Sequence, residues 1–184
     1  SVDQAEQFWD AVWDFTGVIG SKGDLVVEHA AHIADVRFFP NAQLNIAENI
    51  LRPRGAADDL MLVACDESGV NERLSRGEML NRVGQMQQLL LQHDVGVGDV
   101  VAAWLPNTAV SYVVMLAAAG LGATFVSTSP DFGVDGVLDR FGQVVFADFL
   151  FLHSGLLKDV VYHFVFEHRG LQLLAELCVL LHEL

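Results

Sequence analysis

Apolar side chains recur at helical spacing in two segments of this 184-residue chain. Residues 2–16 carry them at Ala5, Phe8, Val12 and Phe15, and three glycines follow within the next seven residues, which predicts a helix and then a loop. Residues 75–93 carry them at Met79, Val83, Met86 and Leu90. Ser75 and Glu78 have the spacing of a capping box, so the second helix is predicted to begin there. A short helix is also predicted over residues 44–51.

Short apolar runs without helical spacing alternate with these segments. Strands are predicted at residues 61–65, 100–105, 123–127 and 144–147, and helices at 108–121, capped by Asn107, and 134–141. Strands that are buried on both faces have continuous apolar runs, as these do. Alternation of strand and helix is typical of an α/β fold, so we expect a mostly parallel sheet with helices on both faces, preceded by an N-terminal helical arm.

One stretch of 31 residues, 100–130, contains no charged side chain and is long enough for a membrane span. Pro106, Asn107, Gly120 and Gly122 divide it into pieces that are each too short to cross a bilayer. The pattern therefore favours a buried β–α–β unit over a transmembrane helix.

The C-terminal segment differs in character, since ten of the fourteen residues of 171–184 are apolar. Exposing five leucines there would cost on the order of 8–15 kcal/mol, which rivals the stability of a domain. We expect this segment to be helical and to pack on the sheet, to self-associate with a second copy, or to lie on a membrane surface. The predicted regions are a helical arm (1–55), an α/β sheet region (56–150) and a divergent apolar helical tail (151–184).

Charge and cysteine content narrow the function classes. The net charge is −14, with 24 acids against 10 bases that are scattered along the chain. No basic face is available to neutralise phosphates, which argues against a nucleic-acid partner. The two cysteines, Cys65 and Cys178, are far apart, and no secretory signal is visible, so we expect a reduced, cytoplasmic protein.

Three isolated features carry little chemistry by themselves. Lys22 lies in a glycine-rich loop that lacks the spacing of a phosphate-binding motif, although its ammonium group remains available for an anion. His29 and His32 are too few ligands for a zinc site. Cys65 falls in a predicted buried strand and has no base nearby, so we expect an inert packing role.

Three segments together point to a family. They are residues 8–24 (FWDAVWDFTGVIGSKGD), 37–51 (RFFPNAQLNIAENIL) and 127–142 (STSPDFGVDGVLDRFG). In this order they resemble the opening region of acetoacetyl-CoA synthetases, which are acid–CoA ligases of the adenylate-forming superfamily. The resemblance implies part of a large α/β domain whose intact form uses ATP, Mg²⁺ and CoA. It also implies acetoacetate as the acid, which is activated as an acyl-adenylate and then transferred to CoA.

The resemblance implies a CoA-side site at Pro130, Asp131, Phe132 and Gly133, because the matching loop lies near the CoA entrance in the acetyl-CoA branch. Two observations leave this open. Residues 149–157 contain no Lys or Arg, although the resemblance implies basic residues after the next strand, which is predicted at 144–147. Asp131 also fits a purely structural role at the start of the following helix.

The sequence has neither the family's Ser/Thr/Gly-rich Pro-Lys phosphate loop nor its C-terminal catalytic lysine. We therefore expect an N-terminal fragment of a ligase that is not catalytic alone, with no catalytic residue, metal ligand or cofactor of its own. The alternative is a truncated or diverged homologue without activity that acts as an α/β interaction module through residues 171–184.

Overall fold

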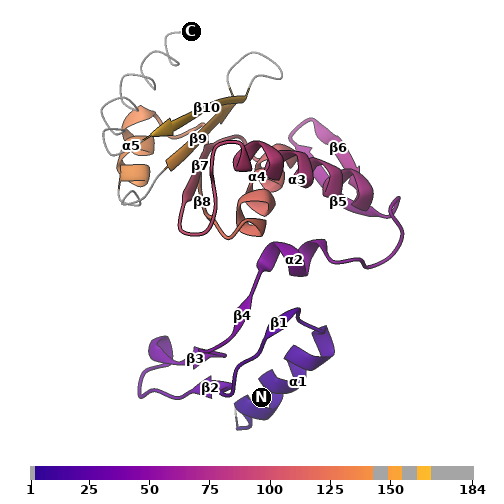
Figure 1. Ribbon diagram of the computed structural model, residues 1–184, viewed down its shortest axis with the longest axis vertical. Coiled ribbons are helices and arrows are strands. Elements are labelled where there is room, and N and C mark those ends of the chain that lie inside the picture. Colours follow the sequence, from indigo (N-terminus) through magenta and orange to yellow (C-terminus); the bar gives the residue numbers. More distant parts are fainter. Residues whose placement is uncertain (1–2, 143–148, 155–160, 167–184) are drawn as a thin grey trace. The chain divides into compact units, whose positions relative to one another are not determined.

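The computed structural model describes residues 3–142, 149–154 and 161–166, and the chain divides into two compact units, Ser1–Arg52 and Pro53–Leu184 (Figure 1). The three-region division that the sequence suggests, with a separate tail from residue 151, stays a prediction. Among the described residues, no helix has the length and apolar character that crossing a bilayer requires.

The described part of the first unit contains two α-helices, one 3-10 helix and two short antiparallel ladders. Helix α1 spans Ala5–Thr16, the 3-10 helix η1 Ile33–Asp35 and helix α2 Ile46–Leu51. Strand β1 (Gly20–Ser21) pairs with β4 (Gln43–Leu44), and β2 (Val27–Glu28) pairs with β3 (Arg37–Phe38). Both α-helices agree with the sequence prediction, whereas the two-residue ladders were not anticipated.

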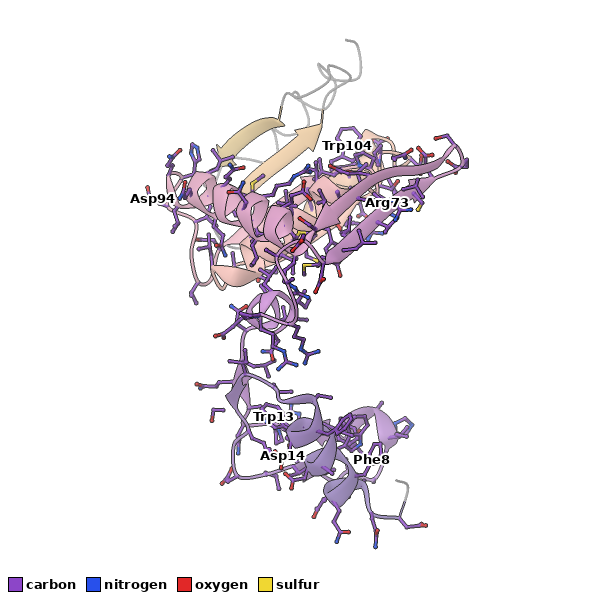
Figure 2. All side chains as sticks on the ribbon, turned by 90° about the vertical axis from the view of Figure 1, so that its right-hand side faces the viewer. Phe8, Trp13, Asp14, Arg73, Asp94 and Trp104 are labelled. Atoms are coloured by element: carbon purple, nitrogen blue, oxygen red, sulfur yellow. The ribbon has the colours of Figure 1, made fainter. Side chains whose placement is uncertain are left out.

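Polar contacts and aromatic rings hold the first unit together, since few of its described apolar side chains are buried. The amide of Asn49 bonds both the N–H and the carbonyl of Ile19, each at 2.8 Å. Arg52 donates to the carbonyls of Thr16 and Gly17, which satisfies the end of α1. Figure 2 shows Phe8 and Trp13 on this unit, where Trp13 lies 4.8 Å from the Phe39 ring, centroid to centroid.

The second unit is built on a four-stranded sheet of order β10-β9-β7-β8. Strand β7 (Val100–Trp104) runs parallel to both β8 (Thr124–Thr128) and β9 (Phe149–Ser154), while β10 (Val161–Phe166) is antiparallel to β9. All five residues of β7 are buried, as the continuous apolar run predicts for a central strand. The mostly parallel sheet is therefore confirmed, and the predicted strand at 144–147 lies outside the described residues.

Helices lie on both faces of this sheet. The chain leaves β7 for β8 on one side, through α4 (Ala109–Gly120), and then returns past β7 to β9, through α5 (Val134–Gly142). Because crossovers between parallel strands are right-handed, these opposite directions place α4 and α5 on opposite faces, and Figure 1 shows them on either side of β7 and β8. Helix α3 (Arg76–Leu91) packs against α4.

Two parts of the second unit differ from the sequence prediction. Strand β5 (Leu60–Asp66) was expected, but its partner β6 (Gly69–Ser75) was not, and the two form an antiparallel sheet of their own. The predicted helical tail begins at residue 151, whereas β9 and β10 occupy 149–154 and 161–166 as strands. Their aromatic and β-branched side chains favour extended backbone. The predicted helix at 171–184 lies outside the described residues.

Candidate functional site

The carboxyl ends of β7 and β8 form a point where the chain connections diverge. The connection after β7 leads to α4 on one face, and the connection after β8 leads to α5 on the other. In open α/β sheets, ligands bind at such a switch point, just beyond the carboxyl ends of the strands. Residues 104–108 and 128–133 are named the carboxyl edge below. They include all four of the residues that the resemblance assigned to a CoA-side site.

The loop after β8 is fixed by a turn and by a tryptophan from the neighbouring strand. Ser129 to Phe132 forms a turn in which the N–H of Phe132 donates to the carbonyl of Ser129 at 3.1 Å. Pro130 occupies the second turn position, which its fixed φ favours. The indole N–H of Trp104 donates to the same Ser129 carbonyl at 3.1 Å, and this links the loop to the end of β7. Figure 2 shows Trp104 in the body of the second unit.

Asp131 bonds back within this turn. The hydroxyl of Ser129 donates to its carboxylate at 2.9 Å, and the Asp131 N–H lies 3.3 Å from the Ser129 hydroxyl oxygen. One carboxylate oxygen is thus engaged inside the loop. Whether Asp131 contacts a ligand or stabilises the start of α5 stays a prediction.

Phe132 packs along α5 and meets an arginine there. A Cβ added at Gly136 would lie 3.3 Å from the Phe132 ring, so the missing side chain lets the ring approach the helix closely. One turn later, the guanidinium carbon of Arg140 lies 5.2 Å from the centroid of the same ring, within cation–π range. The Phe132 side chain remains 46% exposed.

Helix α5 is anchored by the face that adjoins Gly136 and Arg140. Val137 and Phe141 are both 0% exposed, and each stabilises the packed helix by about 1.5–3 kcal/mol relative to an exposed side chain. Because this burial fixes the rotation of α5, Gly136 and Arg140 are held beside the loop after β8.

Thr128, the last residue of β8, is a buried polar side chain at the carboxyl edge. It pairs in register with Trp104 and is only 5% exposed. Its hydroxyl oxygen has no hydrogen-bond partner among the described residues. A buried hydroxyl without a partner costs about 1–3 kcal/mol, so this position is suited to accept or donate a bond to a ligand or a water molecule.

The charges around this edge are mostly acidic. Asp131, Asp135 and Asp139 all belong to the loop or to α5. Arg140 is the single lysine or arginine between Asp99 and Lys158 in the sequence. Neither Arg140 nor Thr128 was predicted as a site residue from the sequence. The signal that could have identified Arg140 is its position as a single base in a long stretch without other bases.

Lys22 and His32 of the first unit form hydrogen bonds with residues close to them in the fold. Lys22 donates to Asp10 at 2.7 Å and to Asp14 at 2.6 Å, and these two hydrogen bonds raise the pKa of its ammonium group. The expectation that Lys22 is available for an anion is therefore corrected. His32 accepts the Ala34 N–H at 3.2 Å and caps η1.

Two further observations concern Cys65 and the possible metal ligands. Cys65 is exposed rather than buried, because a two-stranded sheet leaves one face open. Over the described ranges, no three His, Cys, Asp or Glu side chains come together in a way that could hold a metal ion.

Comparison with known proteins places the chain in a family. A family model described as AMP-binding enzyme matches residues 52–146. The chain belongs to the AMP-binding enzyme family. Acetoacetyl-coenzyme A synthetase from Rhizobium meliloti (strain 1021) is 44% identical over 144 residues, which is 78% of this chain and 22% of that protein. Acetoacetyl-CoA synthetase from Xenopus tropicalis is 40% identical over 147 residues, with the same coverage of both chains.

A solved structure agrees with this assignment. Acetoacetyl-CoA synthetase from Streptomyces lividans matches with a TM-score of 0.68 and 34% identity, covering 77% of this chain and 22% of that one. The predicted resemblance and the α/β fold class are thereby confirmed. The chain spans about a fifth of the length of the relatives it matches.

Proposed function

We propose that this chain forms the N-terminal, CoA-side part of an ATP-dependent ligase that joins acetoacetate to CoA. The observation that carries the proposal is the identity of 37–44% with acetoacetyl-CoA synthetases over 78% of the chain. Placement of the loop at 129–133 on the carboxyl edge supports the CoA side of the proposal, since this is where open α/β sheets bind ligands. The proposed contact residues are Pro130, Asp131, Phe132 and Gly133.

A second relative indicates the chemical class of the acid. Malonamoyl-CoA synthetase from Penicillium aethiopicum is 31% identical over 171 residues, or 88% of this chain. Acetoacetate and malonamate are both short carboxylic acids with a carbonyl group β to the carboxylate. The acid proposed for the intact ligase therefore belongs to this class, with acetoacetate preferred on the higher identities.

The activation step is proposed to need residues outside this chain. The matched segment is only 22% of the Rhizobium meliloti relative, and no Ser/Thr/Gly-rich Pro-Lys loop occurs among the 184 residues of this chain. When bound, ATP and Mg²⁺ would supply the adenylyl group that activates the carboxylate. The residues described above would instead form a wall for the CoA nucleotide. Free ATP and CoA as substrates fit the cytoplasmic location expected from the cysteines.

The test is ligand binding to the purified 184-residue chain. A ligand that binds only the folded state raises the melting temperature with its concentration. We expect a saturable shift with CoA, and none with ATP or acetoacetate. Absence of a CoA shift at millimolar concentration would contradict the CoA-side assignment. Release of AMP from ATP in the presence of acetoacetate and CoA would contradict the proposal that activation needs residues outside this chain.

A further inference from the structure

Basic side chains are scarce around the carboxyl edge, so few residues of this chain could meet a phosphate there. Residues 149–157, which include strand β9, contain no Lys or Arg. Three aspartates lie in the loop and in α5, so an anionic ligand is repelled there unless a cation stands close by. Between Asp99 and Lys158, the sequence offers Arg140 alone.

We propose that Arg140, stacked on Phe132, is the residue that binds a phosphate of the CoA nucleotide at the carboxyl edge. This inference rests on the proposed function and deepens it, since it identifies the anion contact of that site. A guanidinium has five N–H donors in a plane, and stacking on a ring leaves the edge of that plane free for phosphate oxygens.

Packing of α5 and of the Phe132 ring holds Arg140 in position. Burial of Val137 and Phe141 fixes α5, and the absent side chain of Gly136 brings Phe132 against the helix. The Arg140 guanidinium carbon then lies 5.2 Å from the centroid of the Phe132 ring.

Arg140 remains accessible to an anion. Its side chain is exposed, and it takes part in none of the ion pairs found between described residues. Phe132 belongs to the turn held by Trp104, so one rigid assembly links the arginine to the end of β7. Such preorganisation reduces the entropy that a flexible side chain would lose on binding.

The experiment measures CoA affinity by titration calorimetry on the full chain and on four variants. Arg140→Met removes the charge and keeps the length, and Arg140→Lys keeps the charge but loses the planar fork. Phe132→Leu removes the ring. Arg82→Met is the matched control, because Arg82 is an exposed arginine of α3 that pairs with Glu72 at 2.8 Å, outside the carboxyl edge. Circular dichroism checks that each variant is folded.

We expect Arg140→Met to weaken CoA binding on the order of ten-fold or more, as for loss of a charge-assisted hydrogen bond. Arg140→Lys and Phe132→Leu should each weaken binding by a smaller factor, and Arg82→Met should leave it unchanged. With 3′-dephospho-CoA, a variant effect that persists assigns Arg140 to the diphosphate, and one that disappears assigns it to the 3′-phosphate.

Three results would overturn the inference, and they are distinguishable from one another. Wild-type affinity in Arg140→Met refutes the role of Arg140 and leaves the proposed function intact. Equal weakening in Arg140→Met and Arg82→Met indicates only a general effect of net charge, which also refutes it. Absence of saturable CoA binding to the wild-type chain refutes this inference together with the proposed CoA side.

Discussion

Replacing Thr128 by valine is expected to stabilise the second unit. The side chain is 5% exposed, and its hydroxyl oxygen is buried without a partner among the described residues. A buried, unsatisfied polar group costs about 1–3 kcal/mol. Valine has a similar volume and the same β-branch, so it removes this cost without leaving a cavity or changing the preference for extended backbone. The expected gain is about 2 kcal/mol.

The gain can be measured as a shift in the urea midpoint or in Tm. For a chain of this length, about 2 kcal/mol corresponds to a rise in Tm of roughly 4–8 °C. Thr128→Ser is the first control, because it keeps the hydroxyl and loses a buried methyl group, and it should lower stability by about 1 kcal/mol. Thr124→Val is the second control, since Thr124 lies in the same strand but is exposed, and it should change stability by less than about 0.5 kcal/mol.

The reasoning fails if Thr128→Val lowers Tm as much as Thr128→Ser does. That result would mean that the hydroxyl has a partner in solution, such as an ordered water molecule, and that losing this bond outweighs the relief of desolvation. A valine variant that is more stable but binds CoA less tightly would instead place the hydroxyl in the ligand site, where the free protein tolerates the cost.

Two further predictions concern helix capping and backbone conformation. Ser75→Ala should cost about 1 kcal/mol at pH 7 by removing the capping box of α3, as measured by the urea midpoint. Hydrogen bonds from the backbone N–H and the hydroxyl of Ser75 lower the pKa of Glu78. Only the hydroxyl bond is lost in the variant, and its contribution is present above the ordinary carboxyl pKa of 4.5 and is lost as pH falls through the lowered pKa. An equal difference between wild type and variant at pH 7 and pH 3 would contradict the assignment. Gly23→Ala should destabilise the first unit by more than about 1 kcal/mol, because φ is +77° there and the new Cβ would lie 2.8 Å from Asn41 Cβ. Gly84→Ala, in the open interior of α3, should instead stabilise by about 0.5–1 kcal/mol, and both effects are measurable as shifts in Tm.

The parts of the fold that follow from local pattern were predictable. The capping box at Ser75 and the helical spacing after it locate the start of α3, where both reciprocal hydrogen bonds are present. The continuous apolar runs located β7 and β8. By contrast, the sequence of β6 is mainly polar and does not predict a strand. It is extended because it pairs with β5. The two-residue ladders of the first unit likewise depend on partners that are distant in sequence.

The residues of the candidate site also differ in how far the sequence could predict them. The loop at Pro130–Gly133 was found by resemblance, since its residues form a contiguous motif. The role of Thr128 was not, because the burial of its hydroxyl results from strand pairing and from packing around β8. The prediction for Cys65 was wrong for a related reason: an apolar strand is buried only if both faces are covered, and β5 belongs to a sheet of two strands.

Recognition of CoA by this chain would have to depend on short-range contacts. With a net charge of −14, the long-range field repels an anionic ligand, although salt screens it beyond about 10 Å at 0.1 M. Contacts within hydrogen-bond distance are screened much less. Under the proposal made above, one cation on a packed helix would act after the ligand arrives and would contribute little to its rate of approach. If CoA binds there as proposed, affinity would depend mainly on slow dissociation, and the link from Trp104 through the turn to Phe132 and Arg140 would matter more than the number of bases.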